Sequence, residues 1–129
     1  MKKINRVYIA GAYSADNVLF VLDNIRIGMK MGTKVLLAGY SPFVPWFDFH
    51  FQLMLEKDEK LTVKDYYKYS MSWLEVSDAI LVLPNSENST GTQKEIERAK
   101  ELNISIFYSL EALIKEKLNG KEQKSLGKN

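Results

Sequence analysis

The chain has 129 residues, 46% of them hydrophobic, which suits one domain around a single core. It has no cysteine, and its formal net charge of +2 is spread through segments of mixed sign, so we expect neither disulfides nor a nucleic-acid partner. No apolar run is long enough to cross a bilayer and no signal segment opens the chain, which predicts a cytoplasmic protein with no membrane partner. With His50 as its one histidine, the chain is expected to hold no metal and no cofactor.

The first third of the chain predicts a strand, a helix and a second strand. Residues 6–12 form a short apolar run that ends at a glycine, which is typical of a strand buried on both faces. From residue 16 apolar side chains recur at helical spacing until Gly32, which we expect to end the helix. Residues 33–38 then predict a strand that pairs in parallel with the first.

The middle of the chain combines a loop with two helices. Residues 39–45 carry two prolines and a glycine, and the aromatic stretch 46–55 that follows predicts a short helix. Thr62 is the expected N-cap of a second helix that runs to about residue 76.

The last third predicts two more strands, each followed by a helix. The expected elements are a buried strand at 79–84, a helix at 91–102, a strand at 104–108 and a helix at 109–118. We therefore expect one domain over residues 1–118 and a flexible tail over residues 119–129.

Alternating strands and helices predict an α/β fold, a three-layer αβα sandwich of the flavodoxin or Rossmann type. Its parallel sheet would have four to five strands in the order 2-1-3-4. Ligands of such sheets bind beyond the carboxyl ends of the strands, so the turns at residues 11–14 and 85–92 are the candidate site.

The second of these turns combines groups that suit an anion. Residues 89–92 read Ser-Thr-Gly-Thr at the expected start of a helix, where backbone N–H groups and the helix dipole favour a phosphate. Glu95 follows one turn later, where we expect the helix to stabilise an ionised carboxylate that could act as a nucleophile. The alternative is a Thr-x-x-Glu capping box, in which Glu95 returns to the backbone of Thr92.

Three segments resemble the nucleoside 2-deoxyribosyltransferase superfamily: residues 7–11 (Val-Tyr-Ile-Ala-Gly), 73–79 (Trp-Leu-Glu-Val-Ser-Asp-Ala) and 89–95 (Ser-Thr-Gly-Thr-Gln-Lys-Glu). The likeness is greatest to its 2′-deoxynucleoside 5′-monophosphate N-hydrolase branch and related phage and bacterial proteins. The resemblance implies that Glu95 attacks the anomeric carbon and forms a covalent glycosyl-enzyme, and that Tyr8 orients it. It also implies a group of substrate-binding residues, the last of them reaching a neighbouring protomer: Gly11, Ala12, Tyr13, Ser14, Ser89, Gly91, Thr92 and Asn119.

The chain departs from this family at the position of the general acid. The hydrolase branch places an aspartate three residues before the Trp-Leu pair, where this chain has Ser70. We favour Asp65, upstream on the same helix, as the acid; Asp48 and Asp78 are the alternatives, although Asp78 is better explained as the start of a buried strand. The turn at 11–14 also lacks the family's basic residue, which Arg26 or another lysine or arginine would have to replace.

Aromatic residues fill the middle of the chain, and each group has two interpretations. Those of residues 46–51 suit either the wall of a base pocket or a core or dimer interface, and Tyr13 is the better candidate for contact with base or sugar. A stripe over residues 66–73 suggests packing on the sheet or between the protomers of a homodimer or higher homo-oligomer. His50 is expected to be a packing residue.

The leading hypothesis is therefore an enzyme that cleaves or transfers at the N-glycosidic bond of a nucleoside or its 5′-monophosphate. The alternative is a nucleotide-binding or sensor protein of the same fold that has lost catalysis with the aspartate at position 70. A third possibility is an assembly subunit that binds no nucleotide at all.

Overall fold

The computed structural model describes residues 3–126, and it describes side chains for residues 3–118. The elements follow in the order β1 (Arg6–Ala10), α1 (Val18–Leu37), β2 (Ser41–Phe43), the 3-10 helix η1 (Pro45–Asp48), α2 (Phe49–Leu53), α3 (Val63–Leu74), β3 (Ala79–Val82), the 3-10 helix η2 (Pro84–Ser86), α4 (Thr90–Glu101), β4 (Ser105–Phe107) and α5 (Leu110–Leu126).

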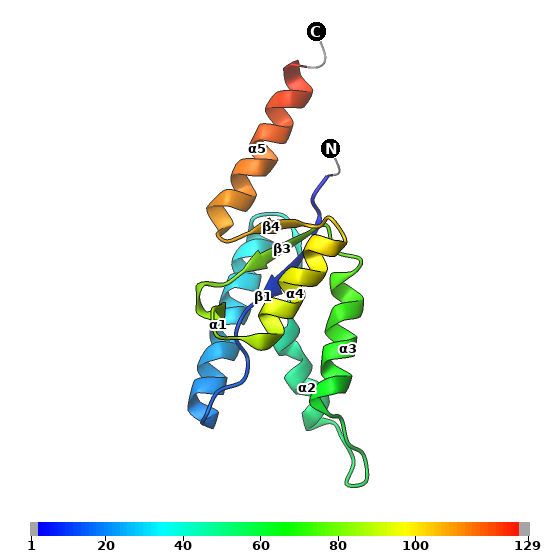
Figure 1. The fold of residues 1–129 in the computed structure, drawn as a ribbon. Coiled ribbons are helices and arrows are strands. Elements are labelled where there is room, and N and C mark those ends of the chain that lie inside the picture. The colour runs from blue at the N-terminus through cyan, green and yellow to red at the C-terminus, as the bar shows by residue number, and fades with distance from the viewer. Residues whose placement is uncertain (1–2, 127–129) are drawn as a thin grey trace.

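The four strands form one parallel sheet in the order β2-β1-β3-β4, which confirms the predicted order 2-1-3-4. Strand β1 lies at the centre, where Tyr8 pairs with Phe43 of β2 on one side and with Ile80 of β3 on the other. Helices cover both faces of the sheet, so the predicted three-layer α/β sandwich is confirmed (Figure 1).

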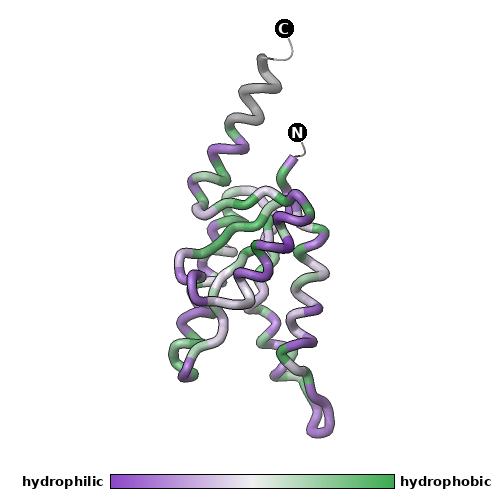
Figure 2. The backbone as a smooth tube through the Cα atoms, in the orientation of Figure 1, coloured by the Kyte–Doolittle hydropathy of each residue, from purple (hydrophilic) through white to green (hydrophobic). Residues whose placement is uncertain are grey.

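Each face of the sheet has its own apolar cluster because side chains along a strand alternate between faces. Val7 and Ile9 of β1 pack with α1, η1 and the start of α5, whereas Tyr8 and Ala10 pack with α3 and α4. All four of these β1 side chains are buried, as the uninterrupted apolar run predicts. Figure 2 shows the hydrophobic residues concentrated on the strands and a hydrophilic loop between α2 and α3.

The predicted strand at residues 33–38 is wrong, because residues 33–37 continue α1. The buried positions of this helix are Ile25, Gly28, Gly32 and Val35, a helical spacing that crosses the expected stop at Gly32. Gly32 is needed inside the helix, since a Cβ there would meet Val44 at 2.4 Å. The chain turns instead at Gly39, whose φ of +97° suits glycine.

The second strand lies inside the expected loop, at β2. It is a three-residue edge strand, a place where Pro42 costs few ladder hydrogen bonds. Trp46 of η1 is 1% exposed and packs against α1 at Gly28, where a Cβ would lie 2.2 Å from its ring. Its indole Nε1 donates to the Ala12 carbonyl at 3.1 Å, which ties η1 to the turn after β1.

The second half of the chain follows the predicted order of elements. Thr62 caps α3 as expected, and β3, α4 and β4 lie within two residues of their predicted bounds. Helix α5 continues to Leu126, so it enters the expected tail, and the division at residue 118 stays a prediction. None of the helices in the described part of the chain combines the length and apolar character needed to cross a membrane.

Candidate active site

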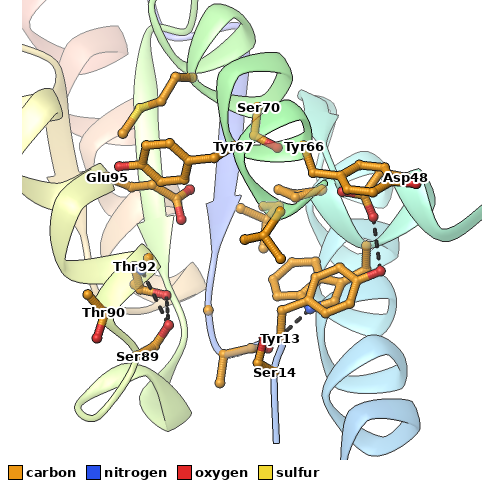
Figure 3. Close-up of a pocket in the computed structure, with 18 of the residues that line it drawn as sticks. Tyr13, Ser14, Asp48, Tyr66, Tyr67, Ser70, Ser89, Thr90, Thr92 and Glu95 are labelled. Carbon is orange, nitrogen blue, oxygen red and sulfur yellow. Dashed lines mark hydrogen bonds between the residues drawn. The ribbon is translucent and has the colours of Figure 1, made fainter. Parts of the chain in front are cut away.

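A cavity of about 610 Å³ opens where β1, β2 and β3 end and α3 and α4 flank the sheet (Figure 3). Both predicted turns, after β1 and after β3, contribute to it, as the strand-end rule requires. The polar and charged side chains of the cavity include Tyr8, Tyr13, Ser14, Asp48, Tyr66, Tyr67, Ser70, Asn85, Asn88, Ser89, Thr90, Thr92 and Glu95.

Glu95 of α4 points into this cavity from one side (Figure 3). Its Oε2 atom is buried and has no hydrogen-bond partner among the described residues. Burial raises the pKa of Glu95 to about 7, although a hydrogen bond from Tyr8 lowers it. The expectation that the helix start would favour the ionised form is thus wrong, because desolvation is the larger effect.

Tyr8 connects Glu95 to position 70. The Tyr8 hydroxyl donates to the Glu95 carboxylate, and Ser70 of α3 donates to the Tyr8 oxygen. Tyr8 is 1% exposed, and burial together with the nearby Glu95 charge raises its pKa well above the usual value for tyrosine. Tyr8 therefore stays protonated and holds the carboxylate as a hydrogen-bond donor, with Ser70 behind it.

The capping-box alternative for Glu95 is wrong, because the N-cap of α4 is Ser89 and Thr92 lies inside the helix. Ser89 Oγ accepts from the Thr92 backbone N at 3.3 Å and from Thr92 Oγ1 at 2.9 Å. Its own hydroxyl hydrogen stays available for a ligand. At Gly91 a Cβ would meet nothing within 4 Å, so the start of α4 faces open space.

Asp48 lies across the cavity from Glu95, with Tyr66, Tyr67 and Ser70 of α3 along one edge between them (Figure 3). It is 8% exposed and accepts a hydrogen bond of 2.9 Å from the Tyr13 hydroxyl. Burial raises the pKa of Asp48 above its usual value, against the hydrogen bond from Tyr13, which lowers it. The cavity thus holds two desolvated carboxyl groups on opposite walls.

The other candidate acids lie elsewhere. Asp65, the favoured one, is exposed and caps α3, where its Oδ2 accepts from the Thr62 backbone N at 2.8 Å and the hydroxyl at 2.9 Å. These bonds lower the pKa of Asp65, which is the wrong direction for an acid. Asp78 precedes β3 and accepts from the backbone N–H groups of Asn5 and Arg6, at the end of the sheet away from the cavity.

Two further residues that were expected to contact substrate, Arg26 and Asn119, are not among the described residues that line the cavity. Arg26 pairs with Asp23 at 2.8 Å on the surface of α1, so it does not replace the missing basic residue of the first turn. Asn119 lies in α5, and its side chain is outside the described part of the chain.

The two strand-end turns are held together by asparagines that were not among the expected site residues. Asn85 Oδ1 accepts from the Ala12 backbone N at 3.4 Å, and Asn24 Nδ2 donates to the Tyr13 carbonyl at 3.1 Å. Gly11 lies so close to β3 that a Cβ there would meet Leu83 at 2.7 Å. The position of Asn85, just beyond a buried strand, was the available signal for its role.

The aromatic residues divide between the cavity and the surface. Trp46 and Phe49 line the cavity, as do Tyr66 and Tyr67 of the predicted α3 stripe. A second group, Phe43, Phe51, Tyr69 and Trp73, forms ring contacts with centroids 5.5 to 5.9 Å apart outside it. Helical spacing alone could not separate these two faces of α3. His50 is exposed and does not line the cavity. Its Nδ1 lies 3.2 Å from the Phe47 carbonyl and its ring centroid lies 6.4 Å from that of the Phe47 ring, which fits the hydrogen-bonded packing role expected for it.

Cations are missing from the wall of the cavity. None of the described residues that line it is lysine, arginine or histidine. Lys94 does not line the cavity, but its ammonium lies 5.7 Å from the centre of the ring of Tyr67, which does. The described residues also contain no group of three or more His, Cys, Asp or Glu side chains arranged for a metal.

Comparison with protein families assigns the chain to one family. Residues 28–108 match the family model described as a domain of unknown function, DUF4406, and the chain belongs to this family. No curated protein matches the sequence.

Solved structures show the same fold. The chain resembles a 2-deoxyribosyltransferase from the psychrotolerant bacterium Bacillus psychrosaccharolyticus, with a TM-score of 0.58, 14% identity, and coverage of 78% of this chain and 69% of that one. It also resembles a conserved protein from Enterococcus faecalis V583, with a TM-score of 0.62, 14% identity, and coverage of 81% and 62%. The fold is therefore that of the 2-deoxyribosyltransferases.

Proposed function

We propose that this protein cleaves or transfers at the N-glycosidic bond of a nucleoside, with Glu95 as the nucleophile. The observation that carries the proposal is the unpartnered, buried Oε2 of Glu95, which faces a cavity large enough for a nucleoside at the carboxyl ends of the strands. A pKa of about 7 leaves a large fraction of Glu95 ionised at neutral pH. The shared fold with a 2-deoxyribosyltransferase supports the same reaction class.

The proposed reaction has two displacements. A Glu95 carboxylate oxygen attacks the anomeric carbon, and the bond to the base breaks with its electron pair on the departing nitrogen. Water or a second base then attacks the same carbon from the opposite side and returns the electron pair to Glu95. Water gives hydrolysis and a second base gives transfer, so the branch of the superfamily depends on which acceptor reaches the sugar.

The other cavity groups have roles that follow from their places. Tyr8, backed by Ser70, is a positioning residue for Glu95. Asp48, on the opposite wall, would face the leaving base, a place that Asp65 does not reach. Ser89 and Gly91 at the start of α4 would hold the 5′ end of the sugar or a 5′-phosphate.

The test is chromatographic detection of free base from a panel of nucleosides and 5′-monophosphates, with and without an added acceptor base. We compare the wild type with Glu95→Gln, and with Glu97→Gln as a control at an exposed glutamate of the same helix. Release that is lost only in Glu95→Gln supports the proposal. Release that persists in that variant would exclude Glu95 as the nucleophile.

The second candidate is a nucleotide-binding protein without catalysis, and Ser70 is the observation that favours it. At the position of the family's aspartate this chain has a hydroxyl, which donates to Tyr8. Calorimetric binding of a nucleotide together with no release of base from any member of the panel would establish this function instead.

A further inference from the structure

The cavity has carboxyl groups but no cation to balance them. Glu95 and Asp48 both lie in it with little solvent, and no lysine, arginine or histidine is among the described residues of its wall. A buried carboxylate without a partner is costly, and a positive charge placed nearby removes most of that cost. The Glu95 carboxylate accepts from Tyr8, but its Oε2 has no hydrogen-bond partner, and none of the described residues that line the cavity brings a positive charge to it.

The remaining walls of the cavity suit a flat cation. Phe49 and Tyr66 line it, beside Trp46, whose ring packs on Gly28 of α1, and Tyr67, whose ring has the Lys94 ammonium 5.7 Å from its centre. The open faces of such rings attract positive charge as well as aromatic bases. Asp48, which Tyr13 fixes by a 2.9 Å hydrogen bond, lies at the end opposite Glu95. A bound nucleoside with its anomeric carbon at Glu95 therefore places its base toward Asp48 and the rings.

We propose that the substrate is a nucleoside whose base carries a fixed positive charge, a pyridinium or N-alkylated purine riboside or deoxyriboside. This proposal rests on the proposed function, because it assigns the class of base that the same cavity accepts. It also explains Ser70. A neutral base needs a proton in order to leave, whereas a cationic base does not.

The chemistry balances without a general acid. When Glu95 attacks the anomeric carbon, the electron pair of the glycosidic bond moves to the ring nitrogen and cancels its positive charge, so the base leaves neutral. Water then attacks the anomeric carbon, the ester bond to Glu95 breaks, and the proton of the water passes to solvent. Asp48 donates no proton in this sequence and acts as the counter-charge of the bound base.

The experiment compares matched pairs that differ in charge and little in shape. The pairs are 7-methylguanosine against guanosine, 7-methyl-2′-deoxyguanosine against 2′-deoxyguanosine, and nicotinamide riboside against its reduced, uncharged dihydro form. Free base is followed by chromatography with the full chain, with rates in the presence of Glu95→Gln subtracted as background. We expect kcat/KM for the cationic member of at least one pair to exceed that of its neutral partner by about tenfold or more.

Asp48→Asn distinguishes a counter-charge from a proton donor. As a counter-charge, Asp48 contributes to binding, so the variant should raise KM for the cationic substrate and leave kcat within about twofold. Asp58→Asn, at an exposed turn between α2 and α3, is the matched control and should change neither.

Each outcome separates this proposal from the one on which it rests. Equal or faster cleavage of the neutral members would overturn the cationic substrate and leave the glycosidic function standing. No cleavage of any compound here or in the wider panel would overturn both. A fall of kcat rather than a rise of KM in Asp48→Asn would assign Asp48 as a proton donor and contradict the counter-charge role.

Discussion

Glu95 illustrates how a residue's depth can outweigh its place along a helix. The start of α4 was expected to favour its ionised form, but the helix begins at Thr90, so Glu95 lies beyond the first turn, where the dipole is weak. Burial then decides, and it raises the pKa of Glu95 to about 7. The proposed nucleophile therefore changes its charge within the physiological pH range.

The first prediction concerns the pH dependence of turnover. Only ionised Glu95 can attack, so kcat/KM should rise with pH about tenfold per unit below 7 and level off above it. The measurement is kcat/KM between about pH 5 and 9 with a substrate identified by the base-release assay. A profile that is flat through pH 7 would contradict the role of Glu95 as the titrating nucleophile.

The second prediction separates the two roles of Ser89, the N-cap of α4 and a donor to ligand. Ser89→Ala removes a cap and should lower the free energy of unfolding by about 1 kcal/mol. It should also weaken the binding of a 5′-monophosphate much more than that of the matching nucleoside, because the variant loses the hydroxyl that we propose as a donor to the phosphate.

Ser109→Ala is the control for this variant. Ser109 Oγ accepts from the Ala112 backbone N at 3.1 Å at the start of α5, outside the cavity. Ser109→Ala should lower the free energy of unfolding by a similar amount in denaturant. It should leave the affinity for both the nucleoside and the 5′-monophosphate unchanged. If Ser89→Ala affects nucleoside and monophosphate equally, the phosphate assignment is wrong.

At the scale of elements, the cavity depends on close contacts between α1 and the segment after β2. Gly28 lets the Trp46 ring lie against the α1 backbone, and Trp46 in turn lines the cavity and holds Ala12. The sequence showed the glycine and the tryptophan but not their contact, because they come together only when α1 packs over the sheet. The helix that connects β1 to β2 thereby shapes one wall of the cavity.

The third prediction uses two glycines with opposite surroundings. Gly28→Ala puts a Cβ 2.2 Å from the Trp46 ring, so it should destabilise the protein by about 1–3 kcal/mol. Gly91→Ala puts its Cβ in open space and should keep or raise the free energy of unfolding, by up to about 1 kcal/mol, because alanine favours a helix over glycine.

Thermal unfolding and ligand titration check both variants. Gly91→Ala should weaken ligand binding although the fold is not destabilised, because the added methyl group occupies space at the start of α4. Unchanged ligand affinity would show that the ligand does not approach this backbone.

At the scale of the whole molecule, the two buried carboxyl groups should influence stability. Because the pKa of Glu95 is raised in the folded protein to about 7 from 4.5, the folded state holds this proton more tightly than the unfolded state does. Its contribution to stability is therefore fully favourable below pH 4.5 and is lost as the pH rises to 7. Asp48, whose pKa is also raised, acts in the same direction.

The fourth prediction follows from this loss of stability as the pH rises. Glu95→Gln, which carries no charge at any pH, should be more stable than the wild type at pH 8 by up to about 3 kcal/mol. At about pH 3.5, well below the 4.5 of the unfolded chain, wild-type Glu95 is mostly protonated in both states, so the two proteins should differ little. Urea unfolding at the two pH values measures the difference, and a variant that is less stable at pH 8 would contradict the cost of burying this charge.

The homodimer or higher homo-oligomer expected from the aromatic stripe stays a prediction. Tyr69 and Trp73 remain partly exposed, at 36% and 46%, while Tyr66 and Tyr67 turn toward the cavity. Sedimentation equilibrium over a range of concentrations measures the state directly. A single species with the monomer mass of 14.9 kDa at every concentration would contradict the expectation.

The sequence by itself determined the class of fold and the order of the strands, and it pointed to the turns that line the candidate site. Uninterrupted apolar runs such as 79–84 are buried strands, and helices between them make the strands parallel, so their carboxyl ends must meet. The turns after β1 and β3, and Glu95 behind them, could be named from this logic. The error at residues 33–38 has the same physical basis, since a short apolar run does not distinguish a strand from a buried helix.

Only the tertiary structure decided which groups share the cavity and which protonation state each of them favours. Asp65 and Asp48 are the same residue type and cannot be distinguished in the sequence. In the structure Asp65 caps a helix in solvent, whereas Asp48 is buried against Tyr13. Likewise, Glu95 could return to the backbone or face a ligand until the start of α4 was placed at Ser89. The physical reason is that desolvation depends on what packs around a group from distant parts of the chain, and local spacing carries no information about it.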